Sequence, residues 1–289
     1  MILKETYRLA DGTAIPKLGL GTWFIDDDKA AEAVRAAVGL GYRLIDTAQA
    51  YGNERGVGEG VRTCGLPREQ LFVASKVAAE LKTYESAARS IDETLEKMGL
   101  DYLDQMIIHS PQPWREFRVE KRYFEENRAV WRALEDAQAA GKVRVIGVSN
   151  FLQDDLDSLL AACRVQPAVN QILLHISNTD LGLLDYCRAR NIQVEAYSPI
   201  AHGEALKNPA IAALAEKYGV SAAQLCIRYV LQLGTVALPK TADPAHMASD
   251  AAVDFVISDA DMEALKHMER ISSYGEFNIF PVFSGKPLA

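Results

Sequence analysis

The sequence predicts a (β/α)8 barrel of the TIM type, built from all 289 residues as a single domain. Eight short apolar runs recur at intervals of roughly 30 residues, and amphipathic stretches separate them. The same alternation is also typical of a doubly wound open sheet. The count of eight within one chain of this length favours the barrel.

The apolar runs are expected to be buried parallel strands. Their residues are continuously apolar rather than alternating, as in strands that are covered on both faces. The expected strands are residues 17–23, 42–48, 71–76, 104–110, 143–150, 168–174, 193–200 and 235–240.

The stretches between the strands have helical periodicity, and several end at glycine, which often follows the last turn of a helix. Examples are residues 27–41, 84–100, 126–142 and 178–191. Two features exceed a minimal barrel. Residues 208–219 and 221–234 predict two helices after the seventh strand, and the aromatic segment 272–289 is expected to form a C-terminal loop.

The charge and composition of the chain argue against several kinds of partner. The net charge of −8 argues against nucleic acid and anionic membranes as partners. There is no run of 18 apolar residues, no signal-peptide pattern at the N-terminus, and no metal-ligand spacing among the five histidines. We therefore expect a cytoplasmic protein without a metal, whose cysteines are buried reduced thiols. These cysteines are Cys64, Cys163, Cys187 and Cys226.

Polar residues stand at the ends of three successive expected strands. Asp46, Lys76 and His109 end or closely follow them, and Tyr51 lies five residues after Asp46. In a barrel these strand ends surround one mouth, where active sites form. Each residue alone is equally well explained as a helix cap or a solvent-facing group, so it is the cluster that indicates a site.

The chemistry of this cluster can be derived from its residue types. A tyrosine hydroxyl, with a pKa of about 10, exchanges protons poorly at pH 7. Lys76 is expected to lower the pKa of Tyr51, Asp46 to keep the lysine charged, and His109 to hydrogen-bond a carbonyl oxygen. The chain has no G-x-S-x-G nucleophile elbow. A tyrosine proton donor without metal or nucleophile indicates carbonyl reduction, which takes a hydride from a cofactor.

A cofactor site is expected at the later strand ends. The run "GLGTWF" lacks the third glycine of a dinucleotide-binding fingerprint, so we reject it as one. Tyr197 is placed to stack on a nicotinamide ring, and Ser149, Asn150 and Gln171 to hydrogen-bond its carboxamide. The run "LPKTADPAH", with its "DP" opening a short helix, is typical of a barrel phosphate site.

The motifs "GLGTW", "RLIDTAQAYGNE", "VASK", "IIHSP", "GKVRVIGVSNF", "VNQI", "EAYSPI" and "LPKT" resemble those of the aldo-keto reductases, in order and spacing. The resemblance extends from about Gly19 to the region of His246, and the diketogluconate-reductase-like branch is the nearest likeness. It implies a barrel that uses NADPH or NADH to reduce aldehydes, ketones or keto sugars reversibly, and a monomer. It also implies a catalytic tetrad at Asp46, Tyr51, Lys76 and His109.

The resemblance assigns further contacts. The expected cofactor contacts are Thr22, Asp46, Ser149, Asn150, Gln171, Tyr197, Ser198, Ile200, Leu238, Lys240, Thr241, His246 and Asp250. The expected substrate contacts are Trp23, Tyr51, His109, Ser110 and Trp114, and the C-terminal loop, residues 272–289, is expected to border the substrate.

Two departures from the family pattern bear on specificity. His246 stands where members that prefer NADPH carry an arginine, and Asp250 disfavours a phosphate, so we expect weakened selectivity for NADPH. Ser110 stands where a tryptophan is common, which predicts a wider or more polar mouth. Trp114 or Phe117, from an expected flap at residues 111–127, either refill that space or only pack the flap against the barrel.

Two other functions are weighed against reduction. One is a cofactor-binding, redox-sensing regulatory subunit with little turnover, which the complete tetrad disfavours. The other is a barrel aldolase or isomerase that uses Lys76 as a Schiff-base amine. Pairing with Asp46 would keep that lysine charged and non-nucleophilic, which argues against it.

Overall fold

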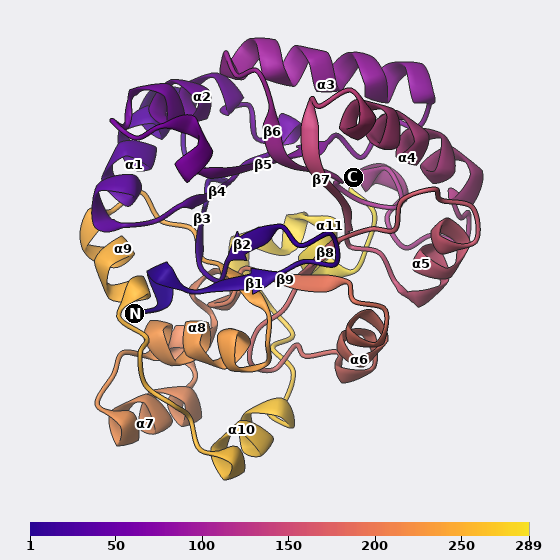
Figure 1. Ribbon diagram of the computed structural model, residues 1–289. Coiled ribbons are helices and arrows are strands. Elements are labelled where there is room, and N and C mark those ends of the chain that lie inside the picture. The colour runs from indigo at the N-terminus through magenta and orange to yellow at the C-terminus, as the bar shows by residue number, and fades with distance from the viewer. Residues whose placement is uncertain (289) are drawn as a thin grey trace.

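The computed structural model describes residues 1–288, and Ala289, the last residue of the expected C-terminal loop, lies outside this range. Within residues 1–288, eight parallel strands form one sheet in the order β10-β9-β8-β7-β6-β5-β4-β3. The sheet closes on itself, because Ala237 N donates to Lys17 O at 2.8 Å and Gly21 N donates to Pro239 O at 2.9 Å. The predicted barrel is thereby confirmed, and Figure 1 looks into its ring of strands. The strands are β3 (Gly19–Gly21), β4 (Leu44–Asp46), β5 (Phe72–Val77), β6 (Leu103–Ile108), β7 (Val143–Ser149), β8 (Val169–Leu173), β9 (Gln193–Tyr197) and β10 (Val236–Leu238).

Helices surround the strands (Figure 1). Two of them, α7 and α8, follow β9, as the sequence predicts. Glycines end α1, α3 and α7 in the left-handed conformation, which glycine adopts without a side-chain clash. The helices are α1 (Asp27–Leu40), α2 (Glu54–Thr63), α3 (Tyr84–Met98), α4 (Phe124–Ala139), α5 (Gln153–Leu160), α6 (Leu181–Ala189), α7 (Pro209–Tyr218), α8 (Ala222–Gln232), α9 (Pro244–Ala251), α10 (Asp259–Lys266) and α11 (Pro281–Ser284).

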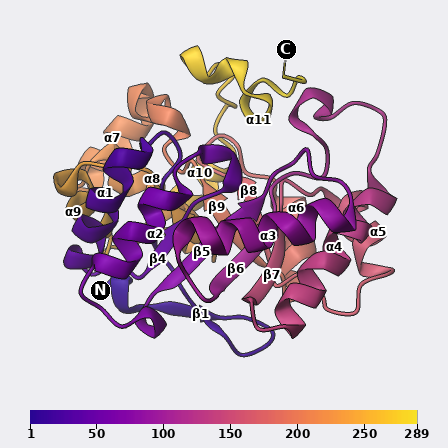
Figure 2. The ribbon, with the colours of Figure 1, turned by 90° about the horizontal axis from the view of Figure 1, so that it is seen from above.

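A short antiparallel hairpin, β1 (Thr6–Arg8) with β2 (Ala14–Pro16), precedes the barrel and is absent from the sequence-based prediction. In Figure 2 it lies below the barrel, at the end opposite the C-terminal segment. Its Leu9 and Ile15 are buried and join the core inside the barrel. The hairpin therefore closes the bottom of the barrel, and its two strands contain no apolar run long enough to reveal them in the sequence.

The core has two parts. One fills the barrel interior with aliphatic and aromatic side chains such as Leu44, Phe72 and Val169. The other, larger part packs the helices against the outside of the strands and includes Trp131 and Tyr229. Gly147 is required inside the barrel, because a Cβ there would lie 2.3 Å from Val169 Cγ2.

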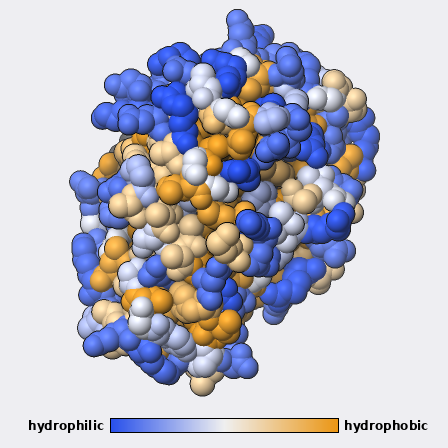
Figure 3. Space-filling view, turned by 60° about the vertical axis from the view of Figure 1, so that its left-hand side comes forward, coloured by the Kyte–Doolittle hydropathy of each residue, from blue (hydrophilic) through white to orange (hydrophobic). Residues whose placement is uncertain are grey.

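The surface is mostly hydrophilic. On the face shown in Figure 3, hydrophobic side chains are scattered among charged ones across the centre, while the upper rim is hydrophilic. The large apolar side chains that are exposed, such as Leu40, Leu152 and Val256, belong to separate segments of the chain. Scattered exposure of this kind is ordinary for a globular protein. No helix among residues 1–288 is long and apolar enough to cross a membrane.

Candidate active site

A cavity of about 310 Å³ opens at the C-terminal ends of the strands, beneath the C-terminal segment that Figure 2 shows above the barrel. Its walls come from every part of the chain. Most residues that the sequence predicts for the site line it: Thr22, Trp23, Asp46, Tyr51, His109, Trp114, Ser149, Asn150, Gln171, Tyr197, Ser198, Ile200, Leu238 and Lys240.

An ion pair lies beneath the cavity floor. Lys76 Nζ, from β5, donates to both carboxylate oxygens of Asp46 at 2.8 and 2.7 Å and to Thr47 O at 2.8 Å. The lysine side chain is only 1% exposed. Burial lowers the pKa of Lys76, but Asp46 and Tyr51 oppose this effect and leave the pKa raised. The ammonium therefore stays charged at neutral pH.

Tyr51 is held above this pair by a turn with many hydrogen bonds. Asn53 Nδ2 donates to Thr22 O and Ile25 O at 2.8 and 2.9 Å, and Thr47 Oγ1 donates to Asn53 Oδ1 at 2.7 Å. Gly52, with φ of 71°, then lets the chain turn from the 3-10 helix Gln49–Tyr51 into α2. This framework fixes the direction of the tyrosine ring.

The electrostatic environment of Tyr51 corrects one expectation. Lys76 Nζ lies 4.8 Å from the centroid of the ring and lowers the pKa of the hydroxyl, as the sequence predicts. Burial, however, is the larger effect, and the pKa of Tyr51 is raised overall. The hydroxyl thus holds its proton at neutral pH, and Lys76 stabilises the phenolate that forms when the proton leaves.

His109 follows β6 and faces the Tyr51 ring, with the ring centroids 5.6 Å apart. Burial, with a further contribution from Lys76, places the pKa of His109 well below its ordinary value. The imidazole is therefore neutral at physiological pH. Its Nδ1 is buried without a hydrogen-bond partner within residues 1–288. Trp114 lies against the other side of the histidine, with ring centroids 5.2 Å apart.

The opposite wall carries an ordered set of polar groups. Asn150 Nδ2 donates to Ser149 Oγ and His109 O, both at 3.0 Å, and Tyr197 Oη donates to Asn150 Oδ1 at 2.8 Å. Ser149 Oγ donates to Gln171 O at 2.8 Å. The hydrogen-bond donors of these side chains are thus bonded within the protein, whereas their oxygen atoms can still accept a hydrogen bond from a ligand. Acceptors beside the flat Tyr197 ring fit the NH2 of a nicotinamide carboxamide.

Besides Lys76, which lies beneath the cavity floor, four predicted residues do not line the cavity: Ser110, Thr241, His246 and Asp250. Ser110 is fully buried, and its carbonyl oxygen accepts from Lys82 Nζ at 2.9 Å. The expected polar widening at this serine is therefore wrong, because Trp114 occupies the wall beside His109.

The other three follow β10, on α9 or just before it, at the edge of the site. Thr241 Oγ1 accepts from Asp243 N at 3.0 Å, and Asp243 Oδ1 caps α9. His246 is exposed, with its Nδ1 3.9 Å from Asp243 Oδ2. Burial raises the pKa of Asp250 to about 6, against the opposing charge of His246.

Sequence reasoning predicted that the C-terminal loop borders the substrate, but it missed the aromatic residues that line the cavity beside Trp23. His202 lines the cavity, its ring 4.1 Å from Phe277 and 5.3 Å from Trp23, and Phe280 lies 4.9 Å from Trp23. Phe24, Pro281, Val282 and Leu288 also line it. The aromatic density of the C-terminal segment is the signal that could have found these residues. The contact with His202 carried no signal, because some 75 residues separate the partners.

The C-terminal segment is fixed at two points. Tyr274 Oη lies 2.9 Å from His175 Nε2, and Leu288 N donates to Trp114 O at 2.9 Å. Trp114 belongs to the expected flap, while Phe117 is buried behind it. Flap and C-terminal segment thus meet over the cavity.

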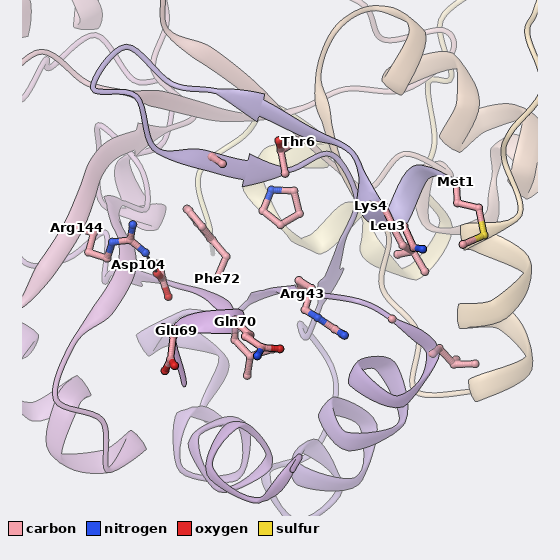
Figure 4. Close-up of a pocket in the computed structure, with 15 residues that line it drawn as sticks. Met1, Leu3, Lys4, Thr6, Arg43, Glu69, Gln70, Phe72, Asp104 and Arg144 are labelled. Atoms are coloured by element: carbon pink, nitrogen blue, oxygen red, sulfur yellow. Dashed lines mark hydrogen bonds and ion pairs between the residues drawn. The ribbon is translucent and has the colours of Figure 1, made fainter. Parts of the chain in front are cut away.

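A second cavity, of about 550 Å³, lies at the hairpin end of the barrel (Figure 4). Asp104 in its wall is paired with Arg144 Nη1 at 2.8 Å and with Arg68 Nη2 at 2.7 Å. This network ties the bottoms of the strands together, and none of the groups described above lies there. We assign the chemistry to the other end.

Comparison with known proteins agrees with this geometry. The sequence matches the model of the Aldo/keto reductase family over residues 17–270. The chain belongs to the aldo/keto reductase family. It is an oxidoreductase that reduces aldehydes and ketones with NAD(P)H.

Relatives of this aldo-keto reductase cover nearly its whole length. It is 39% identical to the glyoxal reductase of Bacillus subtilis over 274 residues, which are 93% of this chain and 95% of that protein. It is 40% identical to the morphine 6-dehydrogenase of Pseudomonas putida, over 91% and 90% of the two chains.

Solved structures of aldo-keto reductases also superpose on this chain. The aldo/keto reductase from Brucella melitensis superposes with a TM-score of 0.84 at 36% identity, covering 91% of this chain and 98% of that one. The Bombyx mori aldo-keto reductase, solved in complex with NADP, has a TM-score of 0.84 at 28% identity, covering 98% of each chain.

Proposed function

We propose that this aldo-keto reductase acts on flat, apolar aldehydes and ketones, with Tyr51 as the proton donor. The buried Asp46–Lys76 pair beneath Tyr51 is the observation that carries the proton-donor assignment. The substrate class rests on the aromatic wall of Trp23, Trp114 and Phe280. This wall favours apolar carbonyl compounds over the keto sugars that a likeness to the diketogluconate-reductase branch implies.

In the proposed mechanism the chain moves one proton. A nicotinamide cofactor, when bound against Tyr197 and the polar wall, would supply the hydride. Neutral His109 orients the carbonyl oxygen, and Tyr51 gives its proton to that oxygen as charge develops. Lys76 stabilises the resulting phenolate, and Asp46 holds the ammonium in place. The raised pKa of Lys76 keeps it protonated, which disfavours the Schiff-base alternative.

The aromatic wall leads to a prediction about substrate choice. Trp114→Ala is expected to raise KM for 4-nitrobenzaldehyde about tenfold, since it removes an aromatic contact worth roughly 1 kcal/mol or more. KM for methylglyoxal, which is too small to span the wall, is expected to change less than threefold. Steady-state kinetics with both substrates checks this.

The matched control is Phe117→Leu, which alters the aromatic residue packed behind Trp114 without touching the cavity. It is expected to leave both KM values within about twofold. An equal rise in both KM values for Trp114→Ala would refute the proposed wall.

We further propose that selectivity for NADPH is weak. Lys240 lines the cavity and is available to a phosphate, but the arginine position holds His246, beside Asp243 and Asp250. An exposed imidazole next to carboxyl groups lacks the permanent charge and the paired donors of a guanidinium, so it gives a 2′-phosphate little attraction. NADH is therefore expected to bind about as tightly as NADPH.

The exchange His246→Arg is expected to tighten NADPH binding about tenfold, because a guanidinium forms charge-assisted bonds with phosphate. NADH binding is expected to stay constant. Quenching of tryptophan fluorescence reports both Kd values, since Trp23 and Trp114 line the cavity.

A suitable control is His267→Arg, since His267 is 72% exposed against 73% for His246 and also faces a carboxylate. This control adds the same charge away from α9. If it tightened NADPH binding as much as the His246 variant, a general charge effect would replace the proposed contact.

We also propose a monomeric, cytoplasmic enzyme. Within residues 1–288 all four cysteines are free, and Cys187 and Cys226 are buried, whereas Cys64 and Cys163 are partly exposed. Reduced thiols are usual in a reducing compartment.

A further inference from the structure

A second carboxyl group lies inside the barrel, behind the Asp46–Lys76 pair. Glu195 comes from the middle of β9 and is 1% exposed. Its Oε1 accepts from Gln105 Nε2 at 2.9 Å, and its Oε2 accepts from Gln171 Nε2 at 2.7 Å. No cation is paired directly with it among residues 1–288. The proposed mechanism leaves this group without a role.

One amide joins the two carboxyl groups. Gln171 Nε2 also donates to Asp46 Oδ1 at 2.9 Å, so its two hydrogens are divided between Asp46 and Glu195. A continuous chain of hydrogen bonds thus runs from Lys76 through Asp46 and Gln171 to Glu195. Gln171 also lines the cavity, at the wall described for the carboxamide. Loss of Glu195 is therefore expected to affect both the Asp46–Lys76 pair and this wall of the cavity.

The charge of this network is adjustable. Lys76 balances one carboxylate, and a second ionised carboxyl leaves the buried network with a net negative charge. Burial raises the pKa of Glu195 to about 7, with Asp46 adding to the rise and the two amides and Lys76 opposing it. These are the charged and hydrogen-bonding groups that face Glu195 from β4, β5, β6 and β8. Its ionisation therefore falls within the physiological range.

We propose that Glu195 is a positioning residue of the reductase, which holds the Gln171 amide against Asp46 and, when ionised, strengthens the hold of Tyr51 on its proton. This proposal rests on the proposed role of Tyr51. An added negative charge favours the protonated forms of Lys76 and Tyr51. Reduction, which needs protonated Tyr51, then extends to higher pH. Alcohol oxidation, which needs the phenolate, begins at higher pH.

The test is the pH dependence of kcat/KM in both directions, for the wild type and Glu195→Gln. The variant keeps the shape and removes the charge. Both the fall of reduction and the onset of oxidation are expected to move to lower pH, by about half a unit to one unit. The Kd for NADPH is expected to change less than threefold.

The matched control is Glu135→Gln, since Glu135 is also a buried carboxylate, on α4, paired with Arg164 outside the barrel interior. It is expected to lower the melting temperature and leave both pH profiles in place. If Glu195→Gln likewise lost only stability, or lost activity equally at every pH, the positioning role would be overturned.

A second variant covers the case in which Glu195→Gln does not fold. In the double variant Glu195→Met/Gln105→Met the carboxyl group and one of its two amide partners become apolar, so that one hydrogen of Gln171 is left unpaired at a cost of about 1–3 kcal/mol. The same shift of both profiles is expected, and unshifted profiles would overturn the proposal. Failure of the proposed function is distinguishable, because Tyr51→Phe would then retain turnover whatever the Glu195 variants do.

Discussion

Replacement of Tyr51 by phenylalanine is expected to lower kcat for carbonyl reduction by about two to four orders of magnitude, the usual contribution of a positioned general acid. The change removes one oxygen atom and leaves the ring between Lys76 and His109. Lys76 keeps its bonds to Asp46 and to Thr47 O, so the floor of the site stays intact. The Kd for NADPH is therefore expected to stay within about twofold.

The measurement is single-turnover reduction together with fluorescence titration of the cofactor. Tyr229→Phe is the matched control, because Tyr229 is fully buried and its hydroxyl lies 2.7 Å from Thr179 Oγ1, remote from the cavity. This control makes the same chemical change and is expected to cost about 1 kcal/mol of stability with normal turnover. Turnover of Tyr51→Phe within a few-fold of the wild type would remove Tyr51 as the proton donor.

The sequence was most informative where one residue type has one physical role. Largely apolar runs located all eight barrel strands, because strands covered on both faces carry few polar residues. Asp46, Lys76 and His109 stood out because they are polar side chains at or just after the ends of such strands. Barrel geometry then brought these ends together without further information.

The sequence was least informative where the contact depends on loops. His202 reaches the cavity from a backbone with φ of 53°, and its partner Phe277 belongs to the C-terminal segment. Neither this backbone conformation of His202 nor its contact with Phe277 can be predicted from the neighbouring sequence. Ser110 is the opposite case. Its position directly after His109 predicted that it lines the cavity, but Trp114 of the flap lines the cavity there instead. In both cases the conformation of a loop, rather than the pattern of the strands, determined which side chain lines the cavity.

The hydrogen-bond network behind the site was not predicted from the sequence either. Glu195 and Gln105 lie within mostly apolar strands, and the sequence does not indicate that the two side chains contact one another. Only the register of β8 and β9, which pairs Gln171 with Glu195, brings carboxyl and amide together. Once paired, the residues form a layer between the apolar barrel core and the cavity.

The stability of the barrel is expected to depend on charge balance within this layer. Asp46→Ala is expected to lower the free energy of unfolding by about 3–5 kcal/mol, because it leaves the Lys76 ammonium buried without a counter-charge. The double variant Asp46→Ala/Lys76→Met is expected to recover most of that loss, since methionine fills the space without a charge. Neither variant is expected to regain reductase activity. Urea denaturation at pH 7 measures all three proteins.

The pH dependence distinguishes this explanation from simple loss of packing. In the wild type the pKa of Lys76 is raised above 10.5, so its stabilising contribution is complete below that pH and is lost as pH rises through the folded-state pKa. Without Asp46, burial is left to lower the pKa of the lysine in the folded state. The unfolded chain then binds more protons, and the stability of Asp46→Ala is expected to rise between pH 7 and pH 9.5. A loss that is the same at both pH values would mean that Asp46 acts through packing, and that the buried charge of Lys76 does not govern the stability of the site.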